Sequence, residues 1–384
     1  MIILGIETSC DETAVSVVEA RGTLDSTHES VRFNVRSQAL YSQVKIHAAY
    51  GGVFPALAKR EHAKNLVPLL KKAVHDAAIE QIKEKSNFNE EKIKKILERE
   101  TGLADMLLKH SADIDRPAID AIAVTAGPGL EPALWVGINF ALALGEIWHI
   151  PVYPTNHMAG HLFSPLITAG TTFQFPVLAL LISGGHTELV VAKDWQNHKV
   201  VGQTRDDAVG EAFDKVARLL NVPYPGGPAI SRLAQEARDA NSTPQFSLPR
   251  PMLDSGDFAF SFSGLKTAVL YLLKKFDNMT DDVRRQVARE FEDAVTDVLI
   301  TKTTHAIAAY EPRTLVIAGG VSANAHIRDA FEKLAANYPD LNLYIPPVTL
   351  STDNAVMIAA AAYISILSGA QPATTIKAAG NLTL

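Results

Sequence analysis

The chain has 384 residues and a formal net charge of −6 at pH 7. A chain of this length buries a large core and usually folds into two lobes. Its 47% hydrophobic and 20% charged residues are typical of an ordinary globular protein. The negative charge excludes a general positive field for nucleic acid, so any nucleic-acid contact needs local basic patches or a partner protein. The single cysteine, Cys10, excludes an internal disulfide and a cysteine-rich metal cluster.

The apolar segments of the chain predict strands and buried helices. The N-terminal residues Met1 to Glu7 indicate a strand and lack the basic and apolar regions of a signal peptide. The apolar run Ala355–Ile366 is too short to cross a bilayer and predicts a buried helix. We therefore expect a protein without membrane contact in the cytoplasm, or in the mitochondrial matrix if a transit peptide has been removed.

Two similar series of predicted elements follow one another along the chain. Each series has three β-prone runs and, later, a fourth run that ends in a glycine turn before a helix. In the first series the runs are Ile2–Glu7, Ala14–Val18, Val31–Val35 and Ala121–Ala126. In the second series they are Val177–Ile182, Thr187–Ala192, Lys199–Thr204 and Thr314–Ala318. The repetition predicts an α/β protein of two similar lobes, each a mixed sheet flanked by helices, with a cleft between them.

The expected domain boundaries follow from this repetition. Residues 1–153 would form an N-terminal lobe, completed by a C-terminal helical segment, residues 355–384. Residues 154–354 would form a C-terminal lobe that carries the nucleotide and metal site. A charged insertion at about residues 80–115 interrupts the first lobe. From Glu80 to Lys109 it is rich in Lys and Glu at helical spacing, which predicts a solvated surface helix.

Two histidines in the sequence Asn-His-Met-Ala-Gly-His are the first candidates for a functional site. If this segment is helical, His157 and His161 share one face about one turn apart and can bind one divalent metal. The alternative is that local hydrogen bonds satisfy both imidazoles. Met158 stands where a zinc protease of the His-Glu-x-x-His type carries its glutamate, so peptide cleavage is not expected.

Two glycine turns and an aspartate each allow a structural and a functional interpretation. The segment Ser183–Thr187 is either a tight hairpin with glycines at positive φ or a set of amides presented to a phosphate or carboxylate. In the segment Gly319–Asn324, Ser322 either caps the next helix or belongs to a nucleotide floor. Asp353 is either the N-cap of the apolar helix or a metal ligand.

Two further segments carry candidate contacts. Gly210–Lys215 begins a helix, and Asp214 within it is either a helix residue without a ligand or a partner for ribose hydroxyls. Gly227 belongs to a Pro/Gly turn, or it lets a flat or sugar group approach the backbone. The segment Asp257–Thr267 alternates like an edge strand that turns into a helix, and its Lys266 is a surface charge or an anion contact.

Taken in order, the motifs resemble the tRNA N6-adenosine threonylcarbamoyltransferase family, called TsaD or Gcp in bacteria, which has archaeal and mitochondrial relatives. The resemblance covers about residues 2–367. The matching segments are Gly5–Thr13, Gly51–Pro55, Arg60–His62, Gly127–Leu130, the His157/His161 pair, Ser183–Thr187, Gly210–Lys215, Ser261–Val269, Gly319–Asn324 and Thr352–Asn354. Three features depart from the family pattern. Glu131–Pro132 replaces a more common Val-Gly, Ser231 stands where some members have a ribose-binding aspartate, and the insertion from Glu80 to Lys109 is larger than usual.

The resemblance implies an actin-like, ASKHA-type fold and a transfer reaction. The threonylcarbamoyl group would pass from threonylcarbamoyl-AMP to N6 of the adenosine at position 37 in tRNAs that read ANN codons, with release of AMP. Because such an amine is a poor nucleophile, the carbonyl must be polarised and the leaving adenylate stabilised. By similarity, His157, His161 and Asp353 bind one divalent metal per chain, Fe2+ by resemblance with Zn2+ as the alternative.

The resemblance also implies residues that contact the substrates. Asp11 and Glu12 would face the reacting centre as a base or orienting group, and their alternative is simple turn chemistry. The Ser183–Thr187 turn would hold the carbamoyl and phosphate region, and Asp214 the adenosine. The full set of implied substrate-binding residues is Ile182, Ser183, Gly184, Gly185, His186, Thr187, Asp214, Gly227, Ser231 and Asn324.

Partners and competing functions complete the expectations. The resemblance implies tRNA as a partner. Bacterial members suggest an inactive paralogue, TsaB, and an ATPase, TsaE, whereas mitochondrial relatives suggest a homodimer. The alternatives are an ASKHA-type ATP-dependent kinase of small molecules and a non-catalytic scaffold paralogue of the modification complex. A kinase would have no use for His157, His161 and Asp353, and a scaffold would normally have lost them.

Overall fold

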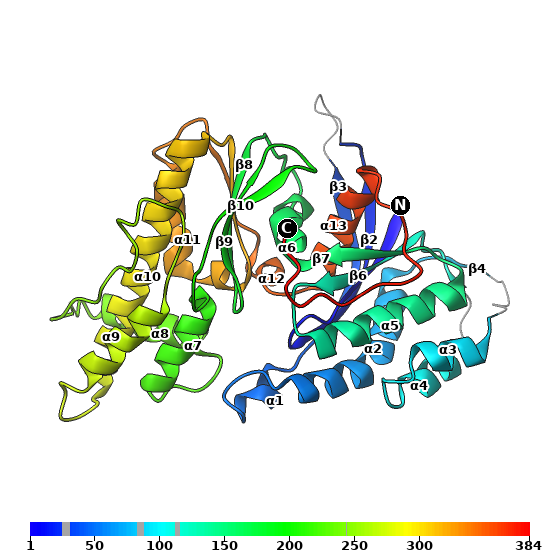
Figure 1. Ribbon diagram of the computed structural model, residues 1–384, viewed down its shortest axis with the longest axis horizontal. Coiled ribbons are helices and arrows are strands. Elements are labelled where there is room, and N and C mark those ends of the chain that lie inside the picture. Colours follow the sequence, from blue (N-terminus) through cyan, green and yellow to red (C-terminus); the bar gives the residue numbers. More distant parts are fainter. Residues whose placement is uncertain (25–30, 83–87, 112–115, 243) are drawn as a thin grey trace. The chain divides into compact units, whose positions relative to one another are not determined.

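The computed structural model describes residues 1–24, 31–82, 88–111, 116–242 and 244–384. The chain divides into two compact units (Figure 1). The first comprises Met1–Thr172 and Asp353–Leu384, and the second comprises Phe173–Thr352. This boundary differs from the expected one after residue 153. The segment 154–172 belongs to the first unit because its helix packs against the C-terminal helix, so the candidate metal ligands lie there and not in the second unit.

The first unit is built on a five-stranded mixed sheet in the order β3-β2-β1-β6-β7. Strand β2 is antiparallel to its neighbours, whereas β1, β6 and β7 are parallel. The strands are β1 (Ile2–Glu7), β2 (Glu12–Arg21), β3 (Arg32–Ser42), β6 (Ala121–Gly127) and β7 (Val152–Asn156). The third strand is therefore longer than predicted. Strands β1 and β6 are almost wholly buried, as central strands covered on both faces must be.

Helices cover both faces of this sheet. Helices α2 (Pro55–Ala77) and α5 (Glu131–Trp148) pack over the face that carries Leu4 and Ile6. Because side chains alternate along a strand, Gly5 faces the opposite side, where α13 (Ala355–Leu367) packs on β1 and β2. A Cβ on Gly5 would lie 2.2 Å from the carbonyl oxygen of Ala355, so glycine lets α13 begin directly against β1. The remaining short helices are α1 (Val44–Ala48), α6 (His157–Phe163) and η1 (Ser164–Ile167).

The charged insertion is helical, as predicted, but it is not a solvated element throughout. It contains α3 (Glu90–Ile96) and α4 (Leu103–Ser111), and the short strands β4 (Gln81–Ile82) and β5 (Arg116–Pro117) flank them. Four apolar side chains of the insertion join the core of the first unit, namely Ile93, Leu97, Leu103 and Leu107. Its residues 83–87 and 112–115 lie outside the described part of the chain.

The second unit repeats the sheet of the first. Its strand order is β10-β9-β8-β11-β12, again with only the second strand antiparallel to the others. The strands are β8 (Val177–Ile182), β9 (Thr187–Ala192), β10 (His198–Gln203), β11 (Thr314–Ala318) and β12 (Asn342–Tyr344). The duplication predicted from the sequence is therefore confirmed.

Long helices complete the second unit, and its apolar core lies between them and the sheet. They are α7 (Val209–Leu219), α8 (Gly226–Asp239), α9 (Ser263–Leu273), α10 (Asp281–Tyr310), α11 (Ala325–Ala335), the short α12 (Val348–Ser351) and η2 (Gly320–Ala323). The predicted edge strand in Asp257–Thr267 is wrong. Phe260 forms only an isolated bridge with Thr204, because α9 starts three residues later.

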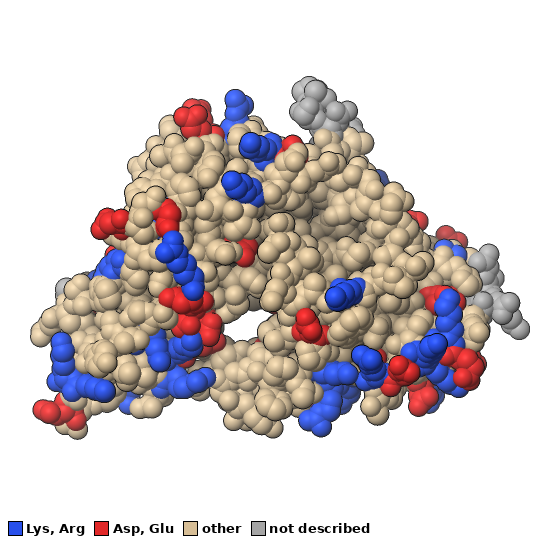
Figure 2. Space-filling view, in the orientation of Figure 1, with Lys and Arg blue, Asp and Glu red and all other residues tan. Residues whose placement is uncertain are grey.

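The surface carries charges of both signs. On the face drawn in Figure 2, Lys and Arg alternate with Asp and Glu in small groups, and they do not form one continuous basic surface. Within the described residues, no helix is both long enough and apolar enough to cross a bilayer.

Candidate active site

Helix α6 brings the two histidines together, as the sequence predicted. Asn156 caps the helix, because its side-chain oxygen accepts from the backbone N–H groups of Met158 at 2.8 Å and Ala159 at 3.1 Å. His157 and His161 then follow one turn apart, with ring centroids separated by 4.8 Å. Both imidazoles are buried, so the pair is not a chance feature of a solvated helix.

Asp353 completes the group from the far end of the chain. Its Oδ1 lies 3.4 Å from His157 Nε2 and 3.2 Å from His161 Nε2. The three candidate ligand atoms all lie within 4.8 Å of one another. Asp353 is not the N-cap of α13, since Asn354 accepts from Met357 N–H at 3.0 Å instead. The Asp353 side chain is 21% exposed, so the group is reached from that side.

Glu7, at the end of β1, orients His157 and was not singled out in the sequence. Its Oε2 lies 3.0 Å from His157 Nδ1 and accepts from the Thr125 hydroxyl at 2.6 Å. A buried carboxylate on Nδ1 leaves Nε2 turned toward Asp353, the arrangement that holds a metal-binding histidine in place. The Ser9 hydroxyl lies 3.3 Å from the same Nδ1. The sequence signal available was only an acidic residue at the end of a buried strand.

The electrostatics of the group favour a cation. Burial opposes a charge on His157, yet the carboxylates of Asp353 and Glu7 outweigh burial and raise the pKa of His157 well above its ordinary value. For His161, burial outweighs the effect of Asp353 and lowers the pKa. The buried carboxylate of Glu7 and the partly exposed carboxylate of Asp353 thus stabilise one positive charge here.

His161 supplies a direct test of whether a metal fits. Its Nδ1 has no hydrogen-bond partner among the described residues, and its Nε2 has only the contact with Asp353 Oδ1 at 3.2 Å, although the imidazole is fully buried. Buried polar atoms are almost always paired, so such an atom calls for an explanation. Two imidazole nitrogens and a carboxylate oxygen form a donor set that suits a divalent transition metal. The residues present therefore fit such an ion.

Asp11 and Glu12 lie at the turn between β1 and β2, in the same unit as the histidines. Burial raises the pKa of Glu12 to about 10, and the charges of Asp11 and Asp353 add to this effect. The Ser42 hydroxyl donates to Glu12 Oε1 at 3.1 Å. Because the pKa of Glu12 responds to Asp353, the predicted catalytic carboxyl groups and the metal ligands belong to one electrostatic environment.

In the second unit, the Ser183–Thr187 segment forms the tight hairpin. The Ser183 N–H donates to the His186 carbonyl at 2.9 Å, and the Ser183 hydroxyl accepts from the His186 N–H at 3.1 Å. The glycines of this turn, Gly184 and Gly185, are exposed, and neither has the predicted positive φ. Ile182 is buried in β8, and the Thr187 hydroxyl accepts from Val209 N–H at 2.8 Å at the start of α7.

The Gly319 turn lies beside this hairpin. Strands β8 and β11 are parallel neighbours, so both turns extend from the same edge of the sheet. Gly319 has a φ of 93°, and a Cβ there would lie 2.4 Å from the Ile182 carbonyl oxygen. Ser322 does not cap the next helix, since Asn324 accepts from Ile327 N–H at 3.0 Å and is the cap.

A buried carboxylate that the sequence did not reveal holds Asn324. The Asn324 amide donates to Glu292 Oε1 at 2.6 Å, and Arg238 donates to Glu292 Oε2 at 2.5 Å. Glu292 lies in the middle of α10 and is fully buried. The only sequence signal for its burial is that Glu292 falls among the apolar positions that form the inner face of α10.

Asp214 and Gly227 lie where α7 meets α8. Asp214 accepts from the Gly226 N–H at 2.7 Å, so it supports the first residue of α8 from mid-α7. A Cβ on Gly227 would meet no atom within 4 Å, which leaves the start of α8 open to an approaching group. Ser231 is half-buried one turn further along α8. The structure brings these three residues together on two helices.

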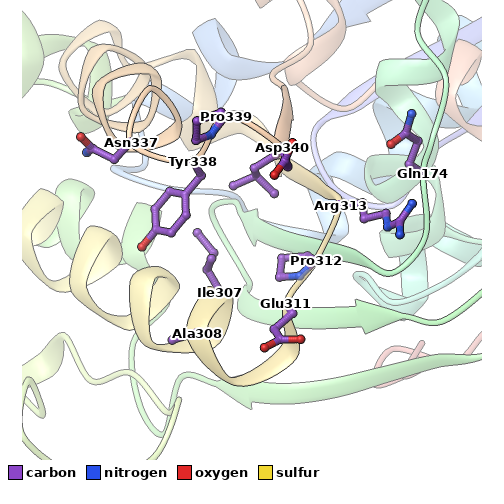
Figure 3. A pocket seen from close by; sticks show the side chains of 11 residues that line it. Gln174, Ile307, Ala308, Glu311, Pro312, Arg313, Asn337, Tyr338, Pro339 and Asp340 are labelled. Atoms are coloured by element: carbon purple, nitrogen blue, oxygen red, sulfur yellow. The ribbon is translucent and has the colours of Figure 1, made fainter.

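A cavity of about 700 Å³ lies at the other end of the second sheet (Figure 3). Its walls include Arg313, just before β11, and Tyr338. The Ser183 and Gly319 turns follow the carboxyl ends of β8 and β11, whereas the cavity lies near the amino end of β11. None of the residues singled out in the sequence lines this cavity, and it does not belong to the candidate site.

The repeated five-stranded sheets, with the same strand order in both units, define an actin-like, ASKHA-type protein, and its group of His157, His161 and Asp353 could hold a metal ion. The sequence model of TsaD, tRNA N6-adenosine threonylcarbamoyltransferase, matches residues 34–84 and 92–360. The chain belongs to this family. It is an acyltransferase that transfers the threonylcarbamoyl group to N6 of adenosine in tRNA.

Two relatives of that name illustrate the similarity. The protein from Nitrosospira multiformis is 42% identical over 369 residues, which cover 96% of this chain and 92% of the relative. The protein from Geobacillus kaustophilus is 40% identical over 383 residues, which cover 100% and 96%. Among solved structures, an ROK hexokinase from Thermus thermophilus covers 96% of this chain and is fully covered itself, at 15% identity and a TM-score of 0.41.

Proposed function

We propose that this enzyme uses threonylcarbamoyl-AMP as its donor and releases AMP. The acceptor would be N6 of the adenosine at position 37 in tRNAs that read ANN codons. The observation that carries the proposal is the convergence of His157, His161 and Asp353, with ligand atoms within 4.8 Å of one another, next to two further carboxyl groups. A simple small-molecule kinase would not need this group.

We assign a divalent metal to these three residues, Fe2+ first and Zn2+ as the alternative. When bound, the ion would act as a Lewis acid that polarises the threonylcarbamoyl carbonyl. Three protein ligands leave coordination positions open for a substrate. Glu7 holds the His157 ring in the orientation that leaves Nε2 free for coordination.

Asp11 and Glu12 would divide two tasks between them. With a pKa near 10, the Glu12 carboxyl is protonated at neutral pH and can donate a hydrogen bond to a developing negative charge. A cation at Asp353 would offset part of this pKa shift. Asp11 would then accept the proton that the attacking amine must lose.

The adenylate would bind to the second unit. The exposed peptide groups of Gly184 and Gly185 would face the phosphate and carbamoyl region, beside His186. The start of α8 at Gly227, with Asp214 and Ser231 nearby, would receive the ribose. Asn324, held by Glu292, would face the adenosine. Ile182 and Ser183 would support the turn that carries Gly184 and Gly185, and the Thr187 hydroxyl connects that turn to α7.

The partners beyond tRNA remain a proposal by similarity. A bacterial setting would supply the paralogue TsaB and the ATPase TsaE in the cytoplasm. A mitochondrial setting would instead favour a homodimer. Size measurement of the isolated chain, and of the chain mixed with either bacterial protein, separates these arrangements.

One experiment tests the proposed function. Protein purified without added metal or chelator is analysed for bound metal, and AMP release from threonylcarbamoyl-AMP is then followed with unmodified tRNA. We expect about one divalent ion per chain and AMP release that depends on tRNA. Metal-free protein with full activity would exclude the metal role. ATP consumption with a small-molecule acceptor, and none with tRNA, would instead indicate a kinase.

A further inference from the structure

A buried network of polar side chains connects helix α2 with the turn that carries Asp11 and Glu12. Its centre is His62, which is fully buried in α2. The Thr13 hydroxyl lies 2.8 Å from His62 Nδ1, and the Gln43 Nε2 lies 3.3 Å from the same atom. His62 Nε2 lies 3.0 Å from the carbonyl oxygen of Cys10. The roles proposed above do not include His62, Thr13 or Gln43.

The partners of the ring determine its protonation. The carbonyl of Cys10 can only accept, so His62 Nε2 must carry the proton and donate it. Nδ1 is then an acceptor, which matches the Thr13 hydroxyl and the Gln43 amide as donors. Burial lowers the pKa of His62 to about 4, in agreement with a neutral ring. Every polar atom of the imidazole is thus used in one fixed tautomer.

The network continues outward to the connection between α1 and α2. His47 Nε2 lies 3.1 Å from Gln43 Oε1, so it donates there, and His47 Nδ1 accepts from the Phe54 N–H at 3.3 Å. All donors therefore point the same way, from Phe54 through His47, Gln43 and His62 to the Cys10 carbonyl. Phe54 stacks on Tyr50 with a centroid distance of 5.9 Å, and both rings are exposed.

At its inner end the network reaches two peptide groups of the turn. The His62 side chain holds the Cys10 carbonyl, and the backbone N–H of Gln43 donates to the Asp11 carbonyl at 2.9 Å. The side chains that follow these peptides are the two carboxyl groups beside the metal ligands. We propose that His62, as the neutral Nε2–H tautomer, is a positioning residue that fixes Asp11 and Glu12 for the transfer reaction. This inference rests on the roles proposed above for those two carboxyl groups.

The consequence is a separation of effects that a purely structural histidine would not produce. In the described part of the chain, the hydrogen bonds of His62 go to Thr13, Gln43 and Cys10, and none goes to a metal ligand or to a residue assigned to the adenylate. Loss of its hydrogen bond to Cys10 should misplace the carboxyl groups and reduce kcat, while metal content and the KM for threonylcarbamoyl-AMP stay constant. A side chain that only fills the core would lower stability without this selective effect on kcat.

The test compares four variants with the wild type in one assay of threonylcarbamoyl transfer to unmodified tRNA. His62→Leu removes all polar contacts. His62→Gln retains an N–H donor for the Cys10 carbonyl, and Thr13→Val removes only the hydroxyl donor to Nδ1. His75→Leu is the matched control, because His75 lies on the same helix with its side chain 89% exposed. Metal content, kcat, KM and the urea midpoint are measured for each.

We expect kcat to fall about 30-fold in His62→Leu and several-fold in Thr13→Val, about 3-fold or less in His62→Gln, and not at all in His75→Leu. Metal content and the donor KM should stay within about 2-fold of wild type. If His62→Leu does not fold, Thr13→Val and His62→Gln decide the question. A wild-type kcat in Thr13→Val and in any folded His62→Leu would overturn the inference. So would a loss of metal in proportion to activity.

Two further measurements separate this inference from the proposed function. Asp11→Asn and Glu12→Gln with wild-type kcat would contradict the roles of the carboxyl groups themselves. Losses in those variants, with none in the His62 and Thr13 variants, would contradict the positioning role alone. Ring ¹⁵N spectra, assigned by the signals absent in His62→Gln, should show the Nε2–H tautomer at neutral pH. An Nδ1–H tautomer would exclude the donor to Cys10.

Discussion

The two sheets share strand order and direction, yet the turns that follow their first strands differ in chemistry. After β1, ionisable groups gather around the turn, namely Glu7, Asp11, Glu12, His62, His157, His161 and Asp353. After β8, the turn contains a serine and two exposed glycines, and the buried Glu292 on α10 holds Asn324 beside the neighbouring Gly319 turn. The repeated fold therefore contains two equivalent sheet ends, one after β1 and one after β8. Burial of charge makes one edge suitable for a cation, and exposed backbone makes the other suitable for an anionic ligand.

Removal of a metal ligand should break this comparison most strongly. In His157→Ala or His161→Ala, we expect loss of bound metal and a decrease in turnover of more than about 100-fold, since one of three protein ligands is missing. Elemental analysis and the transfer assay measure both effects, circular dichroism checks the fold, and His75→Ala serves as the control. Stoichiometric metal in the double variant would refute the assignment.

Glu7 tests whether the buried charge around the first turn supports the ion. Glu7→Gln keeps the shape but removes the charge behind His157 Nδ1. We expect metal affinity to fall by about 10- to 100-fold, the usual cost of losing such a partner. Competition with a chelator measures the affinity, and Glu91→Gln, at a side chain 86% exposed, is the control. Equal affinities in both variants would mean that Glu7 only fills its site.

Asp214 tests the second turn and its neighbouring helices. Because Asp214 supports the first N–H of α8, Asp214→Ala should weaken binding of an adenine nucleotide by about 1.5–3 kcal/mol. Calorimetry with AMP measures the change, and Asp239→Ala at the exposed end of α8 is the control. An unchanged affinity would show that Asp214 only joins α7 to α8. Bound metal should stay at the wild-type level in Asp214→Ala and in Asp239→Ala, because neither residue belongs to the metal site after β1.

The pH dependence of stability tests the buried state of His62. Its pKa is about 4 in the folded chain and 6.5 when unperturbed, because burial outweighs the raising effect of the Cys10 hydrogen bond and of Glu7, while His47 acts in the lowering direction. Between these values the unfolded state binds more protons, so stability is full above pH 6.5 and falls as the pH falls toward 4. From pH 6.5 to 5, wild type should lose about 1.6 kcal/mol more than His62→Gln. Parallel urea midpoints in the two proteins would contradict a buried neutral ring.

The smallest expected effect concerns tRNA, which must be held by local charges. The net charge of −6 leaves only clusters such as Lys59, Arg60 and Lys64, or Arg284 and Arg285, to meet phosphates. Binding by the isolated chain should be weak, and each removed contact should reduce the salt slope by about 1. Filter binding at several salt concentrations measures this slope. Tight binding that ignores charge reversal at both clusters would indicate another surface.

Much of the site was predictable where one local segment decides the geometry. An asparagine before two histidines four residues apart encodes a capped helix with both rings on one face, and α6 has that form. The hairpin at Ser183 and the strands of both repeats were predictable for the same reason. The helix caps were less so: Ser322 and Asp353 both have capping side chains, yet Asn324 and Asn354 are the caps. Neighbouring residues compete for one position, and backbone geometry selects between them.

The repeated fold and the family could be read from the chain alone, because strand periodicity and glycine turns are local properties, and the family resemblance also grouped Asp353 with the two histidines of α6. The role of Glu7 beside His157, and the place of all four residues in the first unit, required the folded chain. The physical reason is packing between distant segments. Gly5 leaves room for the start of α13 against β1, and this contact brings the end of the chain to the turn near its beginning.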